Sequence, residues 1–277
     1  MMETIPISQL RPFEGHPYKV LDNEEMDALT ESVREHGILS PLIVRPLNDG
    51  YEVISGHRRL HAAQRAGLEA VPAFVHEVSR DAAAIELVDS NLHREHILPS
   101  EKAFAYKLKY EAMRHQGTSS QFGTKLRTDE QIAKDSGESR NQIQRYIRLT
   151  HLIPPLLDLV DSDRMAFSVG VELSYLPKPA QEYLAERIEQ DEATPSYSQA
   201  VRLHKLCPSF EFVTLSHEKI DEIMAEDKPN QRERVSLPMD QLRRFFPEYT
   251  PREMQNAIMK LLQDSYGRKK PHDRGAR

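Results

Sequence analysis

Residues 54–63 read ISGHRRLHAA, and this stretch decides how the first part of the chain folds. Ile54 ends a strand-like run, Gly56 permits a sharp turn, and a helical pattern then begins at Arg58 and stops at Gly67. A strand that turns directly into a helix presents unpaired backbone N–H groups at the helix start, and these groups favour a bound anion. The sequence therefore predicts an anion site at this turn.

The segments on either side of this turn predict a small α/β domain. Apolar residues recur at helical spacing before Gly37, and the triplet Asn48-Asp49-Gly50 between two strand-like runs predicts a hairpin. The expected elements are helices over residues 23–36 and 58–66 and strands over residues 42–47, 51–54 and 71–75.

The composition indicates a modular chain with small cores. Of its 277 residues 39% are apolar and 29% are charged, and it has no tryptophan. A single cysteine, Cys207, excludes an internal disulfide and a cysteine-rich metal site, which favours a reducing cytoplasm. The first residues lack the pattern of a signal peptide and no segment is long and apolar enough for a membrane span, so we expect an intracellular protein.

The charge is distributed unevenly around a net value of −6. Residues 1–90 carry eight basic and 15 acidic side chains, whereas residues 91–150 carry eleven basic and seven acidic ones. Phosphate contacts are therefore expected in the second segment. From residue 81 onward the pattern is helical, which predicts an all-α domain over residues 93–206 and a mostly helical segment over residues 207–277.

Residues 128–149, TDEQIAKDSGESRNQIQRYIRL, have the spacing of a DNA-binding helix-turn-helix. Thr128 is expected to cap the first helix and Gly137 to form the turn, with Ile132, Ala133, Ile143 and Tyr146 facing inward. The side chains expected to contact bases and phosphates, in addition to Thr128, are Arg140, Asn141, Gln142, Gln144, Arg145 and Arg148.

An ordinary helical hairpin with a polar face is the alternative interpretation of this segment. A solvated helix normally mixes charges of both signs, yet residues 140–149 contain no acid. This pattern favours sequence-specific binding to double-stranded DNA.

Arg58 and Arg59 add forked, permanently charged donors to the predicted anion site. The alternative is that both arginines pair with the acidic surface of their own domain. A second polar cluster, Asn91-Leu92-His93-Arg94-Glu95, follows at the end of a predicted helix.

The chain resembles the ParB partition-protein family over about residues 5–175, because it contains ISGHRRLHAA, then SNLHRE, then a central helix-turn-helix. The resemblance implies an α+β fold, with a sulfiredoxin-like N-terminal domain over residues 1–92 that binds CTP and Mg²⁺. It implies that Gly56, Arg58 and Arg59 hold phosphates, that Asn91 binds the metal, and that Arg94 reaches the triphosphate. Further nucleotide-binding candidates are His57 and, in the segment FEGHPYKV, His16, Pro17, Tyr18 and Lys19.

Two residues depart from the family pattern. The family often has glutamate at the positions of His57 and Ser90. Carboxylates near a magnesium triphosphate hold the metal or activate the attacking water. Their replacement favours a site that binds CTP with weak or absent hydrolysis (CTPase activity).

The resemblance also implies partners and a location. It implies a homodimer that loads at a palindromic, centromere-like DNA site and closes into a clamp when CTP binds. The implied process is partition of a chromosome, plasmid or mobile element, with a ParA-type ATPase as partner. The protein would be cytoplasmic and associated with the nucleoid or a plasmid. Strand-like Ile5-Pro6-Ile7 begins almost at once, so we expect a weaker ParA link than is usual in the family.

Other functions remain open at this point. A helix-turn-helix transcriptional regulator of a mobile element would use the same DNA-binding helices without nucleotide gating. A sulfiredoxin-type enzyme would need a cysteine near Gly56, and a nuclease would need clustered carboxylates. The capping box Thr250-Pro251-Arg252-Glu253 predicts a last helix, which either packs on its own domain or forms a dimer contact. After it, Arg268-Lys269-Lys270 and Arg274 form a cationic tail.

Overall fold

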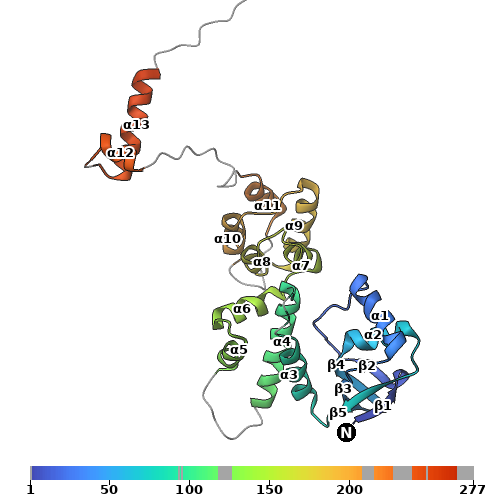
Figure 1. Ribbon diagram of the computed structural model, residues 1–277. Helices are drawn as coiled ribbons and strands as arrows, with labels where there is room; N and C mark the ends of the chain where they lie inside the picture. The colour runs from blue at the N-terminus through green and yellow to red at the C-terminus, as the bar shows by residue number, and fades with distance from the viewer. Residues whose placement is uncertain are drawn as a thin grey trace, which may run out of the picture. The chain divides into compact units, whose positions relative to one another are not determined.

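The computed structural model describes residues 2–92, 94, 96–117, 127–207, 215–226, 239–247 and 249–266. The chain forms two compact units, Met1–Glu226 and Asp227–Arg277. The expected boundary near residue 207 lies inside the first unit. The expected α+β class is confirmed, since one mixed sheet precedes a helical remainder (Figure 1).

The first domain is built on a five-stranded sheet in the order β1-β5-β3-β4-β2. The strands are β1 (Met2–Pro6), β2 (Leu10–Pro12), β3 (Leu42–Leu47), β4 (Gly50–Ser55) and β5 (Ala70–Val75), and a short 3-10 helix, η1 (Ile7–Gln9), joins β1 to β2. The predicted hairpin is confirmed, because β3 and β4 pair antiparallel with Leu47 opposite Gly50. Gly50 is required there, since a Cβ atom would lie 2.5 Å from the carbonyl oxygen of Gln9.

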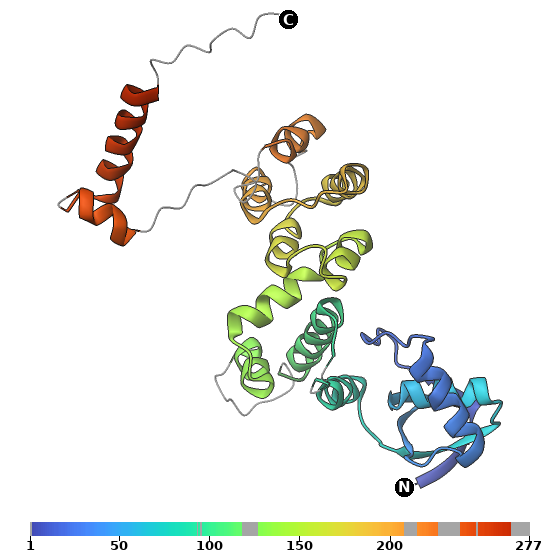
Figure 2. The same cartoon turned by 45° about the horizontal axis from the view of Figure 1, so that its top comes forward.

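Each face of the sheet is covered by helices. On one face, α1 (Glu24–His36) and α2 (His57–Ala66) pack side by side (Figure 2). Successive strand residues point to opposite faces, so Val53 joins the core beneath α1 and α2 while Ile54 packs against α3 (Arg80–Asn91). The turn after β4 is therefore held between two hydrophobic cores.

The helices that follow form the predicted helix-turn-helix. Helix α4 (Pro99–Gly117) packs against α3, against α5 (Thr128–Ser136) and against α6 (Arg140–Leu149). Ile132, Ala133 and Ile143 are buried together with Tyr106 of α4, and Gly137 ends α5 in the left-handed region at φ 72°. The expected cap was wrong by one residue: Arg127 is the N-cap of α5, and Thr128 is its first helical residue.

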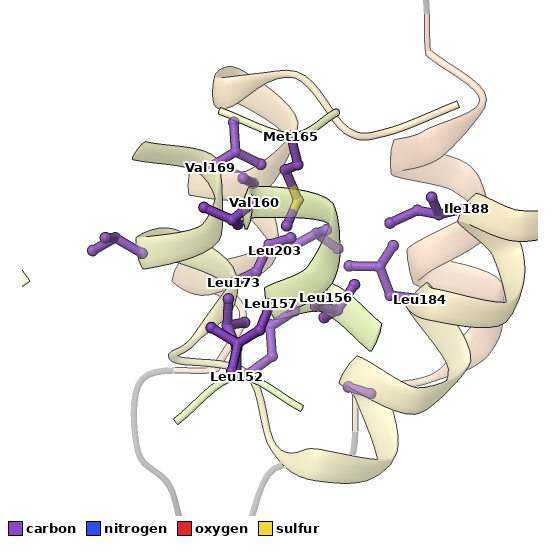
Figure 3. Packing of buried hydrophobic residues seen from close by; sticks show 14 of the residues in the cluster. Leu152, Leu156, Leu157, Val160, Met165, Val169, Leu173, Leu184, Ile188 and Leu203 are labelled. Atoms are coloured by element: carbon purple, nitrogen blue, oxygen red, sulfur yellow. The ribbon is translucent and has the colours of Figure 1, made fainter. Parts of the chain in front are cut away.

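The remaining helices of the first unit share one core (Figure 3). They are α7 (Pro154–Asp161), α8 (Phe167–Leu173), α9 (Lys178–Asp191), α10 (Tyr197–Lys205) and α11 (His217–Met224). Ile220 and Ile223 of α11 are buried in this core, which explains why the first unit extends beyond residue 207.

The second unit contains α12 (Met239–Phe245) and α13 (Pro251–Tyr266). The predicted capping box is confirmed, since the Thr250 backbone N–H and hydroxyl both donate to Glu253 at 2.8 Å. The predicted cationic tail at residues 268–274 and part of the expected linker after Gly117 lie outside the described residues. Within the described part of the chain, no helix has the length and apolar character needed to cross a membrane.

Candidate functional site

The turn between β4 and α2 has the geometry that an anion site requires. Gly56 is the N-cap of α2 and adopts φ 103°, which side chains rarely permit. A Cβ atom at Gly56 would lie 3.0 Å from Cγ of Leu42 and 3.1 Å from Nη2 of Arg59. Gly56 has no side chain to cover the start of α2, where the first N–H groups of a helix have no partner within the helix.

An open pocket of about 640 Å³ lies over this turn. The pocket brings together the start of α2 and the end of α3, which the sequence analysis described as two separate polar clusters. Of the predicted nucleotide-binding residues, Gly56, His57, Arg58, Arg59, Asn91 and Arg94 line it. Glu25, in the first turn of α1, also lines the pocket and was not expected there.

The three arginines of the pocket are held differently. Nη2 of Arg58 donates to Glu25 at 3.0 Å, at an exposed position. Nη1 of Arg59 donates to the carbonyl oxygens of Ser40 and of Pro41, the latter at 2.7 Å, and burial lowers the pKa of Arg59. The guanidinium of Arg94 lies over the ring of Tyr18, with Cζ 5.5 Å from its centroid. An anion that binds Arg58 would therefore have to displace Glu25. The side chain of Arg59, in contrast, is already oriented by its two hydrogen bonds.

His16 and His57 form one wall beside the arginines. Their ring centroids are 3.7 Å apart. Burial lowers the pKa of His57 to about 3, with smaller contributions from the charges of His16 and Arg94. Burial also lowers the pKa of His16 to about 4. Both imidazoles are therefore neutral near pH 7 and add no charge to the pocket.

Tyr18 and Lys19 occupy different surroundings although they are adjacent in sequence. Tyr18 is 4% exposed, its hydroxyl has no hydrogen-bond partner among the described residues, and burial raises its pKa. Nζ of Lys19 instead points to the helical domain, 3.2 Å from Asp161 and 3.8 Å from Asp158. Both residues line a small pocket beside Gly56 and Arg94. Lys19 in addition joins its loop to α7.

Oxygen donors for a magnesium ion are present in the pocket. The amide nitrogen of Asn91 donates to the carbonyl oxygen of Leu87 at 2.7 Å, so its own amide oxygen is the available ligand atom. Ser90 and Glu25 add a hydroxyl and a carboxylate. Mg²⁺ is usually held by one or two protein oxygens together with substrate phosphates and waters, and this set fits that pattern.

The predicted DNA-binding helix is braced by an acid from the preceding helix. Asp129 is 2% exposed, and its Oδ2 accepts from Nε of Arg140 and from Nε2 of Gln144, both at 2.8 Å. Burial alone would raise the pKa of Asp129, but these hydrogen bonds outweigh it and lower the pKa. Sequence reasoning missed Asp129, because its partners lie 11 and 15 residues away.

The other predicted DNA-contacting residues divide into two groups. Asn141 is exposed, and Gln142 and Arg145 are partly exposed. Arg148 instead donates from Nη2 to the carbonyl oxygen of Ser174 at 2.7 Å, and its Cζ lies 4.0 Å from the ring centroid of Tyr175. Arg148 therefore fastens α6 to the end of α8.

A buried lysine connects these helices, and the sequence analysis did not find it. Lys109 of α4 is 1% exposed, and its Nζ lies 2.7 Å from Asp89 of α3 and 3.1 Å from Asp135 of α5. The available signal was its spacing, since Lys109 shares a helical stripe with Ala105 and Ala112. One ammonium group thus joins the helix that ends at Asn91 to the helix-turn-helix.

Known proteins resemble this chain over part of its length. Residues 1–92 match the family model described as the ParB N-terminal domain. Stage 0 sporulation protein J of Bacillus subtilis is 38% identical over 173 residues, which cover 61% of this chain and 56% of that protein. The chromosome-partitioning protein Spo0J of Thermus thermophilus is 36% identical over 158 residues, which cover 57% of this chain and 54% of that protein.

A solved structure adds a further match. The C-terminally truncated chromosome-partitioning protein ParB from Caulobacter crescentus, complexed to the centromeric parS site, is 26% identical, with a TM-score of 0.43. That match covers 73% of this chain and 98% of the other. The chain spans about half the length of the curated relatives named above. Residues 1–92 therefore match the ParB N-terminal domain, and a longer part of the chain is similar to the two partition and sporulation relatives named above.

Proposed function

We propose that this chain is a ParB-type partition protein that binds CTP with Mg²⁺ in its N-terminal domain and double-stranded DNA through α6. The observation that carries this proposal is the convergence of Gly56, Arg58, Arg59 and Arg94 on one pocket. That pocket and a helix-turn-helix occur in one compact unit. The curated relatives named as chromosome-partitioning or sporulation proteins support the same conclusion.

In the proposed nucleotide complex, the phosphates lie at the start of α2. The backbone N–H groups after Gly56 and the charges of Arg58, Arg59 and Arg94 hold the triphosphate. Asn91 contributes its amide oxygen to Mg²⁺, which neutralises phosphate charge when bound. His57 is neutral, so it is a weaker candidate than a carboxylate for binding this metal, and tight CTP binding with slow hydrolysis is expected.

In the proposed DNA complex, α6 enters the major groove. Asn141 and Gln142 are placed in its first turn, where recognition helices contact base edges. Arg140 precedes them, Gln144 and Arg145 follow, and Arg148 holds the helix in place. A homodimer would read a palindromic, centromere-like site with two copies of α6, and a ParA-type ATPase is the proposed partner. The protein would be found in the cytoplasm on the nucleoid or a plasmid.

Two arginines of α2 provide a matched test. Arg58 and Arg65 both pair with acids at the surface, but only Arg58 lines the pocket. We expect Arg58→Ala to weaken binding of labelled CTP with Mg²⁺ by about tenfold, the effect of losing one charge-assisted hydrogen bond. Arg65→Ala should bind CTP as the unaltered protein does.

The same titration separates the proposed function from its main alternative. CTP should bind more tightly than ATP, GTP or UTP, and should change the affinity for a DNA duplex selected from a random library. Binding of DNA without binding of any nucleotide would contradict the proposal and leave a helix-turn-helix regulator.

A further inference from the structure

Helices α7 and α9 border a groove that the proposed nucleotide and DNA sites do not use. Its volume is about 450 Å³. Apolar side chains form its floor: Ile153, Pro155 and Leu159 on the side of α7, and Ala185 and Ile188 on the side of α9. A volume of this size accepts a few apolar side chains.

The two faces of α9 differ in what they contact. Leu184 is fully buried in the shared core (Figure 3), and Ile188, which is 2% exposed, lies where this core borders the groove. Glu182, Glu186 and Glu189 instead line the groove. Their spacing of four and three residues places the three carboxylates in one row along the helix.

Within the described part of the chain, the charged side chains that line this groove differ from Arg187 of the same helix, because they form no ion pair. Among the residues that the structure describes, Glu182, Glu186 and Glu189 form no ion pair, and neither does Arg164, which also lines the groove. Arg187 on the same helix contacts Asp191 at 2.8 Å and Asp221 at 3.0 Å. The carboxylates that line the groove are therefore available to a binding partner.

We propose that this groove is a docking site for a basic amphipathic helix of a partner protein. Apolar side chains of that helix would enter the groove, and lysines or arginines one turn apart would meet the three glutamates. A helix matches the site because the carboxylates recur at helical spacing along α9. Nucleic acid is excluded as the occupant, since three carboxylates outweigh the single positive charge of Arg164 and repel phosphates.

A designed peptide tests this site on the full chain. The probe is a fluorescein-labelled helix of about five turns with leucines on one face and lysines flanking them. A second peptide carries glutamate at every lysine position. Fluorescence anisotropy should show binding of the lysine peptide, weaker at higher salt, and no binding of the glutamate peptide.

Matched variants decide whether the groove is the site. The triple variant Glu182→Gln, Glu186→Gln, Glu189→Gln should bind the lysine peptide about tenfold more weakly, since each exposed ion pair contributes a fraction of that change. Ala185→Leu, which fills the groove and keeps the charges, should also weaken binding. Three exposed glutamates elsewhere provide the control, as Glu69→Gln, Glu77→Gln, Glu111→Gln.

The proposal is overturned if the control triple variant loses as much affinity as the groove variant, because binding would then follow net charge alone. It is also overturned if neither groove variant weakens binding, or if the lysine peptide does not bind. Circular dichroism melting of each variant shows whether the fold is intact, and Ala185→Leu still tests the groove if the triple variant is destabilised.

Discussion

His57 makes the stability of the N-terminal domain depend on pH. Its pKa is about 3 in the folded chain, against an ordinary value of 6.5, and burial is the main cause. Between these values the unfolded chain binds more protons than the folded chain. Stability therefore rises with pH in this range and is lost as the pH falls from about 6.5 toward 3.

We predict that His57→Gln flattens this dependence. Between pH 7 and pH 5 the unaltered protein should lose about 1 kcal/mol more unfolding free energy than the variant, after a discount for the partial exposure of His57. Urea unfolding at several pH values measures the difference. Parallel slopes for His57→Gln and the unaltered protein would show that His57 is not buried as described.

Single-residue roles were predictable where they depend on neighbours in sequence. Gly56 could be assigned to the turn because a strand and a helix adjoin it. Lys19 and Arg148 could not be assigned, because their partners, Asp161 and Ser174, lie 142 and 26 residues away. A basic side chain looks the same in a sequence whether it faces a phosphate or an acceptor of the protein itself, so only the fold distinguishes these roles.

The start of α6 is the element on which DNA binding is expected to depend. Ser139 is its N-cap, and its hydroxyl accepts a hydrogen bond from the N–H of Gln142 at 3.2 Å. Ser139→Ala should lower the unfolding free energy by about 1 kcal/mol, as is usual for the loss of a helix cap. It should also weaken DNA binding, because the first turn carries Asn141 and Gln142.

Ser79 offers a matched control for this prediction. It caps α3 in the same way, accepting from the N–H of Ala82 at 3.2 Å. Ser79→Ala should reduce stability by a similar amount and leave DNA affinity unchanged in anisotropy titrations. Equal losses of DNA affinity in both variants would indicate a general effect of stability, and no loss in either would place the DNA interface elsewhere.

At this scale the sequence was most informative. Periodicity and capping signals placed the helix at Glu24–His36, the hairpin of β3 and β4, and both helices of the helix-turn-helix within about two residues. Local signals could not show that α11 joins the core of α7 to α10, because Ile220 meets that core only through long-range packing. For the same reason the groove between α7 and α9 had no sequence signature.

Across the whole first unit, Lys109 connects the two proposed sites. It binds Asp89, two residues before Asn91 of the pocket, and Asp135 near the end of α5. If CTP and DNA binding are coupled, each ligand must change the affinity for the other by the same factor. A buried ammonium group that contacts both helices is a physical route for that coupling.

We predict that Asp89→Asn reduces the coupling free energy between CTP and DNA by about 0.5–2 kcal/mol, the range found for residues between coupled sites. The measurement is a cycle of four titrations: CTP with and without DNA, and DNA with and without CTP. Asp81→Asn, on the same helix but paired with His115, is the control and should retain full coupling. Unchanged coupling in Asp89→Asn would exclude this route, whereas absence of coupling in the unaltered protein would contradict nucleotide gating itself.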